Sequence, residues 1–187
     1  MRSLKILGLA LGSALLLPTL AMADTGWYID GTLGQAMVDD NDIDDTDTAF
    51  RIGTGWRFFE NFGAEIGYQD LGKVSDSIDA GNLSASVETD GLYAGVAGKI
   101  PLYDGGTGFY LGARTGMYWW DATGRVRSGD TTVSIDDSDS DFYVGVSGGY
   151  DFNEQFGVGL AYDWYQIGDN DADFSYGVWG LTGEVRF

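Results

Sequence analysis

The sequence predicts an all-β chain, an eight-stranded antiparallel up-and-down transmembrane β-barrel. Three observations carry this prediction. Hydrophobicity alternates with a period of two along most of the chain, as in strands. The apolar phase is rich in aromatic residues and the opposite phase in glycine, and short and long connections alternate along the chain. The 187 residues include 30 Gly, 6 Trp, 11 Tyr and 10 Phe, a composition that argues against disorder and against a helical bundle.

Eight alternating segments are each long enough to cross a membrane as a tilted strand of about 9–11 residues. They are expected at 26–37, 48–59, 62–71, 88–101, 108–120, 141–152, 156–166 and 175–187. In the second segment, Phe50, Ile52 and Trp56 share one phase, whereas Arg51 and Arg57 share the other. A membrane barrel turns the apolar phase to lipid and leaves the glycine-rich phase to line a narrow lumen. A soluble β fold such as a lipocalin is the alternative, and it predicts an apolar interior with no lipid-facing stripe.

The connections alternate between two classes, which favours the membrane barrel. Short turns are expected near Glu60-Asn61, 104–107 and 153–155. Longer polar loops are expected at 38–47, 72–87, 121–140 and 167–174. Short periplasmic turns that alternate with long outer loops, on an even number of strands, are typical of outer-membrane barrels.

The first 23 residues predict a cleaved secretory signal peptide. Arg2 and Lys5 precede an apolar run at 6–17, and the segment ends in Ala21-Met22-Ala23. A basic start, a short apolar stretch and a small-x-small site are the elements of such a signal, and the run is too short for a membrane-spanning helix. We therefore expect a signal peptide at 1–23 and an exported barrel domain at 24–187.

Three stretches resemble the small outer-membrane barrels of the OmpA-like transmembrane-domain family. They are Gly26-Trp27-Tyr28, Phe62-Gly63-Ala64-Glu65-Ile66-Gly67-Tyr68 and the terminal Val185-Arg186-Phe187. The resemblance implies a bacterial outer-membrane location. It also implies a carboxy-terminal signal to the barrel-assembly machinery, carried here by Phe187, Val185 and Leu181. We expect no peptidoglycan-binding domain of the kind found in two-domain members, so the resemblance implies no cell-wall tether.

Isolated charges on the lumen phase predict a network of salt bridges, because unpaired charges in a tight interior are costly. The expected members are Arg51, Arg57, Glu65, Lys99, Arg114, Asp163, Glu184 and Arg186. An eight-stranded barrel is just wide enough to be filled by side chains, which favours a packed polar plug. A narrow ion-conducting pore is the alternative.

The outer loops carry most of the acidic residues. The first loop contains Asp39, Asp40, Asp42, Asp44, Asp45 and Asp47, and the fourth contains Asp169, Asp171 and Asp173. The third contains Asp121, Asp130, Asp136, Asp137, Asp139 and, at its edge, Asp141. The spacing departs from the EF-hand pattern, which needs Gly where Asp45 stands and a carboxylate where Arg51 stands. The sequence therefore favours a solvated surface that attracts cations weakly over a specific calcium site.

The composition excludes several function classes. The chain has no Cys and no His, which removes thiolate sites, the commonest general base and the commonest zinc ligand. The barrel enzymes of this membrane are thought to depend on an active-site His, so we expect no enzyme, no cofactor and no bound metal. The net charge of −19 argues against nucleic-acid partners.

We therefore expect a monomeric, non-enzymatic scaffold that sits in outer-membrane lipid and presents acidic loops for surface interaction or membrane integrity. The first alternative is a small, low-conductance, cation-preferring channel. The second is a surface protein stabilised by divalent cations at its loops. The sequence does not identify a ligand, and fold alone does not determine function.

Overall fold

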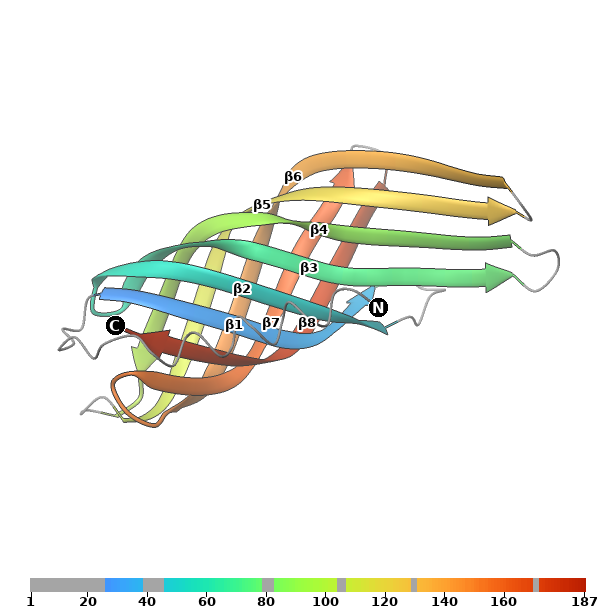
Figure 1. The fold of residues 1–187 in the computed structure, drawn as a ribbon. Helices are drawn as coiled ribbons and strands as arrows, with labels where there is room; N and C mark the ends of the chain where they lie inside the picture. The colour runs from blue at the N-terminus through green and yellow to red at the C-terminus, as the bar shows by residue number, and fades with distance from the viewer. Residues whose placement is uncertain (1–25, 39–45, 79–82, 104–106, 129–130, 170–171) are drawn as a thin grey trace.

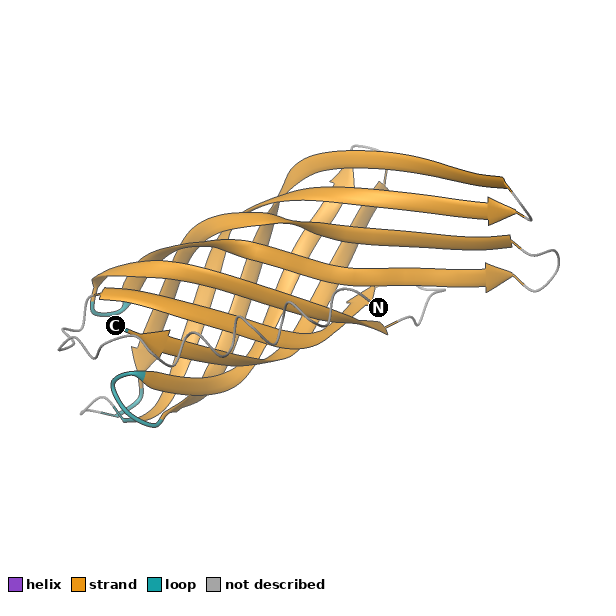
Figure 2. Cartoon of the chain, viewed as in Figure 1, coloured by secondary structure: helices purple, strands orange, loops and turns teal. Residues whose placement is uncertain are grey.

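The computed structural model describes residues 26–38, 46–78, 83–103, 107–128, 131–169 and 172–187. Eight strands form a closed barrel in which each strand is hydrogen-bonded to the next in the chain and β8 returns to β1 (Figures 1 and 2). The strands are β1 (Gly26–Val38), β2 (Thr46–Phe59), β3 (Phe62–Ile78), β4 (Leu83–Pro101), β5 (Gly108–Ser128), β6 (Thr131–Asp151), β7 (Phe156–Asp169) and β8 (Ala172–Arg186). All pairs are antiparallel. The predicted fold class is confirmed.

The barrel is closed by β1 and β8, where Leu33 lies opposite Leu181 and Ile29 lies opposite Val185. The last residue continues this seam, because the Phe187 N–H donates to the Trp27 carbonyl at 2.9 Å. Closure leaves the barrel wall without an unpaired edge, which a strand in lipid requires.

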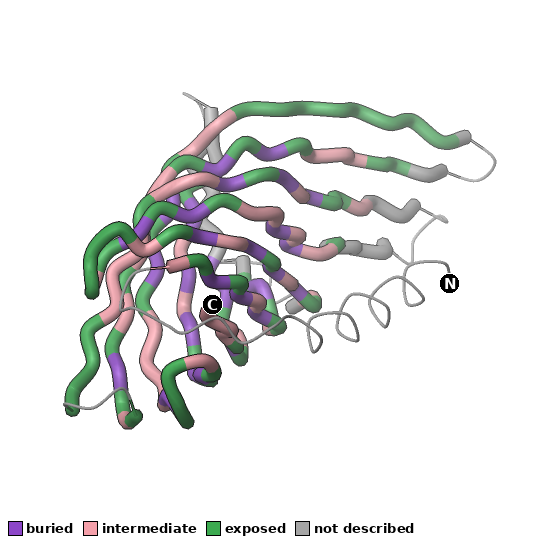
Figure 3. The backbone as a smooth tube through the Cα atoms, turned by 60° about the vertical axis from the view of Figure 1, so that its left-hand side comes forward, coloured by how far each residue is buried: buried purple, intermediate pink, exposed green. Residues whose placement is uncertain are grey.

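The two phases of each strand face lipid and lumen as the alternation predicts. Large apolar side chains on the outer surface are more than half exposed, and they include Leu33, Ile66, Leu92, Val96, Leu111, Val146, Leu160 and Leu181. Buried positions alternate with them along the strands (Figure 3). One departure is Phe59, which the alternation assigns to the lumen but which is 66% exposed. A register shift between Arg57 and Phe59 turns it outward. No helix in the described ranges is long and apolar enough to cross a membrane.

The two hairpins β3–β4 and β5–β6 extend well beyond the other strands. The β2–β3 ladder ends at Phe50 and Asp70, and the β6–β7 ladder ends at Tyr143 and Tyr165. Past these points β3, β4, β5 and β6 continue as an open four-stranded sheet, which projects to the right in Figure 1. We call this region the protruding sheet, and its members are β3 from Lys73, β4 to Asp90, β5 from Asp121 and β6 to Phe142.

The prediction of long loops at 72–87 and 121–140 is therefore wrong. Both stretches are mostly paired strand, for example from Lys73 opposite Glu88 and from Asp121 opposite Ser138. Their polar sequences reflect solvent on both faces of the sheet, and an antiparallel ladder continues wherever cross-strand neighbours support it. The 167–174 connection is also shorter than predicted, since Asp169 pairs with Ala172.

Candidate functional site: the polar lumen and the protruding sheet

Among the residues that the structure describes, five cationic and five anionic side chains of the lumen form ion pairs with one another. The cations are Arg51, Arg57, Lys99, Arg114 and Arg186, and the anions are Asp30, Glu65, Asp151, Asp163 and Glu184. All eight charged residues expected in the lumen lie in this set. Their opposite charges are equal in number, which satisfies the main condition for keeping charges in a narrow interior.

The central ion cluster consists of Asp30, Arg51, Glu65, Arg114 and Asp163. Arg51 Nη2 lies 2.7 Å from Asp30 Oδ2. Arg114 Nε donates to Asp163 Oδ1 at 2.7 Å, and Arg114 Nη1 lies 3.8 Å from Glu65 Oε1. The guanidinium groups of both arginines lie near the ring of Tyr93, at 5.6 and 5.7 Å. Side chains from five strands therefore meet at mid-depth in the barrel.

The turn-side ion cluster lies nearer the short turns and consists of Arg57, Lys99, Asp151, Glu184 and Arg186. Glu184 forms ion pairs with Arg57, with Nη2 and Oε2 2.6 Å apart, and with Lys99, with Nζ and Oε1 2.9 Å apart. Asp151 Oδ1 forms ion pairs with Lys99 Nζ at 2.8 Å and with Arg186 Nη2 at 2.9 Å. Asp151 thus bridges two cations, and Glu184, whose Oε1 also lies 3.6 Å from Arg186 Nε, bridges three. Such a network is more resistant to rearrangement than isolated pairs.

Two members of these clusters were not among the sequence-predicted residues. Asp30 shares the lumen phase with Tyr28 and Thr32 on β1, and Asp151 shares it with Gly149 on β6. The alternation that identified the other eight residues also contains these two. Asp151 is the last residue of its strand, where the boundary between strand and turn is least certain from sequence.

A layer of four tyrosines separates the central ion cluster from the outer mouth of the barrel. Tyr93, Tyr118, Tyr143 and Tyr165 are at most 1% exposed. Their rings form a continuous chain, with centroids at 5.7, 5.9 and 5.2 Å between successive neighbours. The Tyr143 hydroxyl donates to Glu65 Oε1 at 2.7 Å, and the Tyr165 hydroxyl donates to Gln69 Oε1 at 3.0 Å. We call this group the tyrosine layer.

Glycines on neighbouring strands make the space that the tyrosines occupy. A Cβ added at Gly53 would collide with the Tyr93 hydroxyl, and one added at Gly55 would collide with the ring of Tyr28. A Cβ at Gly145 would meet the Asp163 carboxylate in the same way. The glycine-rich phase of the sequence is therefore complementary in shape to the large lumen side chains.

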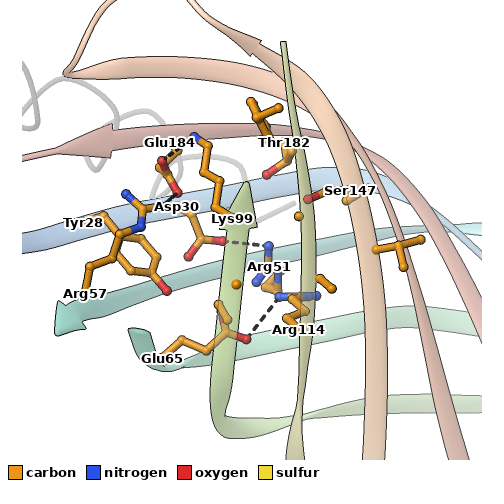
Figure 4. Close-up of a pocket in the computed structure, with 17 residues that line it drawn as sticks. Tyr28, Asp30, Arg51, Arg57, Glu65, Lys99, Arg114, Ser147, Thr182 and Glu184 are labelled. Atoms are coloured by element: carbon orange, nitrogen blue, oxygen red, sulfur yellow. Dashed lines mark hydrogen bonds and ion pairs between the residues drawn. The ribbon is translucent and has the colours of Figure 1, made fainter. Parts of the chain in front are cut away.

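A small cavity lies between the two ion clusters and has a volume of about 70 Å³. Tyr28, Arg51, Glu65, Lys99 and Glu184 are among the side chains that converge on it (Figure 4). Five buried polar atoms of its lining have no hydrogen-bond partner within the described ranges: Tyr28 Oη, Asp30 Oδ1, Arg51 Nε, Arg114 Nη1 and Arg114 Nη2. This mixture of donors and acceptors suits ordered water. Across the described residues, no group of three or more carboxylates converges in a way that could hold a metal ion.

The acidic residues expected in loops fall into two groups. Asp39, Asp40, Asp42, Asp44, Asp45, Asp130 and Asp171 lie outside the described residues. The others are on strands: Asp47, Asp121, Asp136, Asp137, Asp139, Asp141, Asp169 and Asp173. Asp47 connects two strands, because its carboxylate accepts the backbone N–H groups of Thr48 and Lys73. Asp141 accepts the Trp120 indole N–H at 2.8 Å.

The surface of the protruding sheet differs from the lumen in charge and in exposure. Asp121, Asp136, Asp137 and Asp139 are exposed. Val126, Val133 and Ile135 are 42%, 55% and 67% exposed, although they lie beyond the barrel wall. Arg125 and Glu88 form an exposed ion pair on this sheet at 3.6 Å. Loops and sheets raised above a rigid barrel are where such proteins make contacts.

Comparisons with known proteins agree with this architecture. The chain matches the model of the outer membrane protein beta-barrel domain family over residues 7–187, and it belongs to this family. The family and the barrel together place the protein in the bacterial outer membrane, embedded in its lipid. No curated protein sequence is significantly similar to the chain.

Several solved barrels have the same fold. The attachment invasion locus protein Ail of Yersinia pestis is 15% identical, with 87% of this chain and 99% of that chain covered and a TM-score of 0.57. Neisserial surface protein A is 14% identical, with coverage of 87% and 97% and a TM-score of 0.57. OprG from Pseudomonas aeruginosa is 13% identical, with coverage of 86% and 95% and a TM-score of 0.56. Ail has also been solved in complex with the heparin analogue sucrose octasulfate.

Proposed function

We propose that this family member is a non-enzymatic surface scaffold whose protruding sheet and acidic outer residues interact with partners outside the cell. One observation carries the proposal: charged side chains in the lumen form ion pairs with one another, whereas Asp121, Asp136, Asp137 and Asp139 of the protruding sheet are exposed. Among the described residues, five lumen charges of each sign take part in these pairs. The barrel then serves as a rigid support in the membrane, and the sheet serves as the surface of contact.

The acidity of the sheet indicates a different kind of partner from the one seen with Ail. Sucrose octasulfate, the molecule bound to Ail, is an anion. Here the exposed residues of β6 include Asp136, Asp137 and Asp139, and like charges across an interface are unfavourable. We therefore expect cationic partners.

A small cation-preferring channel is the second candidate, and the cavity between the ion clusters favours it. Conduction would require a continuous water path, yet the tyrosine layer lies between this cavity and the outer mouth. Four side chains at most 1% exposed leave little room for water there. The scaffold is therefore the better-supported function.

The two candidates are separated by the conductance of the refolded mature barrel in a planar lipid bilayer, with unfolded protein as the control. The scaffold predicts a silent bilayer, because the lumen is filled. Reproducible cation-selective steps would contradict it and support the channel. A variant with Tyr118 and Tyr165 both changed to Ala thins the tyrosine layer and serves as a positive control for the sensitivity of the recording.

We propose five further features of this surface scaffold. Cleavage after Ala23 would release the barrel domain. Phe187, Val185 and Leu181 would be read by the barrel-assembly machinery. The mature protein would be a monomer without a cofactor or resident metal. The acidic loops would attract divalent cations weakly, and calcium added to the refolded protein would leave its unfolding temperature unchanged.

A further inference from the structure

The outer part of β6 is a free edge of the protruding sheet. β6 pairs with β5 from Thr131 to Asp151, but it pairs with β7 only from Tyr143 to Asp151. From 132 to 140, therefore, one side of the β6 backbone has no strand partner within the described ranges. Figure 1 shows this edge along the top of the sheet, and residues 132–139 on it are all exposed (Figure 3).

Two hydrogen bonds identify backbone groups that point off this edge. The Ser138 N–H donates to Asp137 Oδ1 at 2.9 Å, and the Ser140 N–H donates to Asp139 Oδ1 at 2.7 Å. In an antiparallel ladder, residues two apart direct their N–H groups to the same side. Ser138 and Ser140 therefore present donors to the open side of β6, where exposed carboxylates occupy them.

The side chains along this edge are acidic near the barrel and apolar farther out. Asp137 and Asp139 share a face of β6 with Val133 and Ile135, because these four residues have the same phase. Segment 131–151 contains no Lys or Arg. A second copy of the chain added at this edge would place carboxylates beside carboxylates, which is destabilising. The charge pattern thus disfavours self-association and suits a basic strand.

We propose that the free edge of β6 binds an extended basic polypeptide segment by strand addition. This inference rests on the proposed surface function and names the class of partner. The added strand would accept and donate backbone hydrogen bonds along 132–140, and its alternate side chains would lie opposite those of β6. Lys or Arg would lie opposite Asp137 and Asp139, and apolar residues would lie opposite Val133 and Ile135.

The test measures binding of a labelled peptide, Lys-Thr-Lys-Thr-Val-Thr-Val, to the refolded mature barrel in detergent micelles at physiological ionic strength. In antiparallel addition this sequence places its lysines opposite Asp139 and Asp137 and its valines opposite Ile135 and Val133. The control peptide has the same side chains, but every backbone nitrogen is methylated. It keeps the charge and cannot donate to a strand, so we expect it to bind at least about tenfold more weakly.

Two variants of the protein test separately the contribution of backbone hydrogen bonds and the contribution of the carboxylates to peptide binding. Ser138→Pro removes an N–H that β5 does not use, and proline is tolerated on a strand edge that faces solvent. It should weaken peptide binding by about tenfold while the barrel keeps its heat-modifiable gel mobility. The double change Asp137→Asn and Asp139→Asn should weaken binding to a similar extent. Its control, Glu60→Gln with Glu154→Gln, changes net charge equally at exposed positions in the short turns, at the opposite end of the barrel from the protruding sheet, and should leave binding unchanged.

Three results would overturn the inference. They are absence of binding to the native barrel, equal binding of the methylated peptide, and unaltered binding after both carboxylates on the edge are neutralised. These outcomes are separate from the fate of the proposed function. A silent bilayer without peptide binding would retain the scaffold and reject strand addition, whereas a conducting barrel would reject the scaffold whatever the peptide does.

Discussion

The lumen and the outer part of β6 are both rich in carboxylates, but these carboxylates are paired with cations in the lumen and exposed on β6. In the lumen, each carboxylate contacts a cation, as Glu184 contacts Arg57 and Lys99. On the outer part of β6, Asp137 and Asp139 are exposed and accept backbone N–H groups of their own strand. A buried charge requires a partner within the protein, whereas an exposed one is stabilised by water and remains free to meet a partner from outside. The contrast separates the residues that hold the barrel together from those available for binding.

The largest loss of stability is expected when one partner of a buried ion pair inside the barrel is removed. Arg114→Ala leaves Glu65 and Asp163 buried without their cation, and removal of one partner from a buried pair costs about 3–5 kcal/mol. We expect the free energy of unfolding to fall by this amount. The measurement is a urea titration of the refolded barrel followed by tryptophan fluorescence.

A second substitution controls for the volume lost with the arginine side chain. Arg114→Ala combined with Asp163→Asn removes one of the uncompensated carboxylates, so the double variant should be more stable than Arg114→Ala alone. If the two variants have equal stability, or if Arg114→Ala unfolds like the native barrel, charge pairing in the lumen is not a source of stability.

The next effect concerns the space inside the barrel. Gly53→Ala should lower the free energy of unfolding by about 1–3 kcal/mol, because overpacking forces side chains from their preferred positions and the new methyl group would collide with the Tyr93 hydroxyl. Gly183→Ala is the matched control on the lipid side, where a Cβ would meet nothing within 4 Å. It should change stability by no more than about 0.5 kcal/mol. The urea titration is again the measurement, and equal effects of the two changes would contradict the steric role of Gly53.

The sequence was sufficient to predict the barrel and the lumen phase, because both follow from a period of two that each strand carries locally. Phe50 and Arg51 lie on opposite phases whatever the neighbouring strands do. The partners within the lumen could not be predicted in the same way. Lys99 and Glu184 are 85 residues apart, and whether they meet depends on the stagger of all the strands between them.

The length of the outer hairpins was mispredicted for a different reason. Between 72 and 87, the polar character of the sequence predicts a loop. Beyond the membrane, both faces of a sheet are wet and a lipid-facing stripe is no longer needed. Polarity marks where a strand leaves lipid, not where it ends. The end of a strand is set by its pairing with a neighbouring strand, such as Lys73 opposite Glu88. This pairing depends on two segments and cannot be read from one of them alone.

The smallest effect is expected at the exposed ion pair of the protruding sheet. Arg125 and Glu88 are 3.6 Å apart, and their side chains are 50% and 48% exposed. Solvent screens such a pair, and its coupling should not exceed about 0.5 kcal/mol. A double-mutant cycle with Arg125→Ala and Glu88→Ala, measured by the same urea titration at low and high salt, isolates this energy from other effects of each change. A coupling as large as the loss caused by Arg114→Ala would show that the sheet, like the lumen, depends on ion pairs. A near-zero coupling would mean that backbone pairing, not this ion pair, keeps the sheet extended. Surface charges of the sheet could then be substituted without destabilising the barrel.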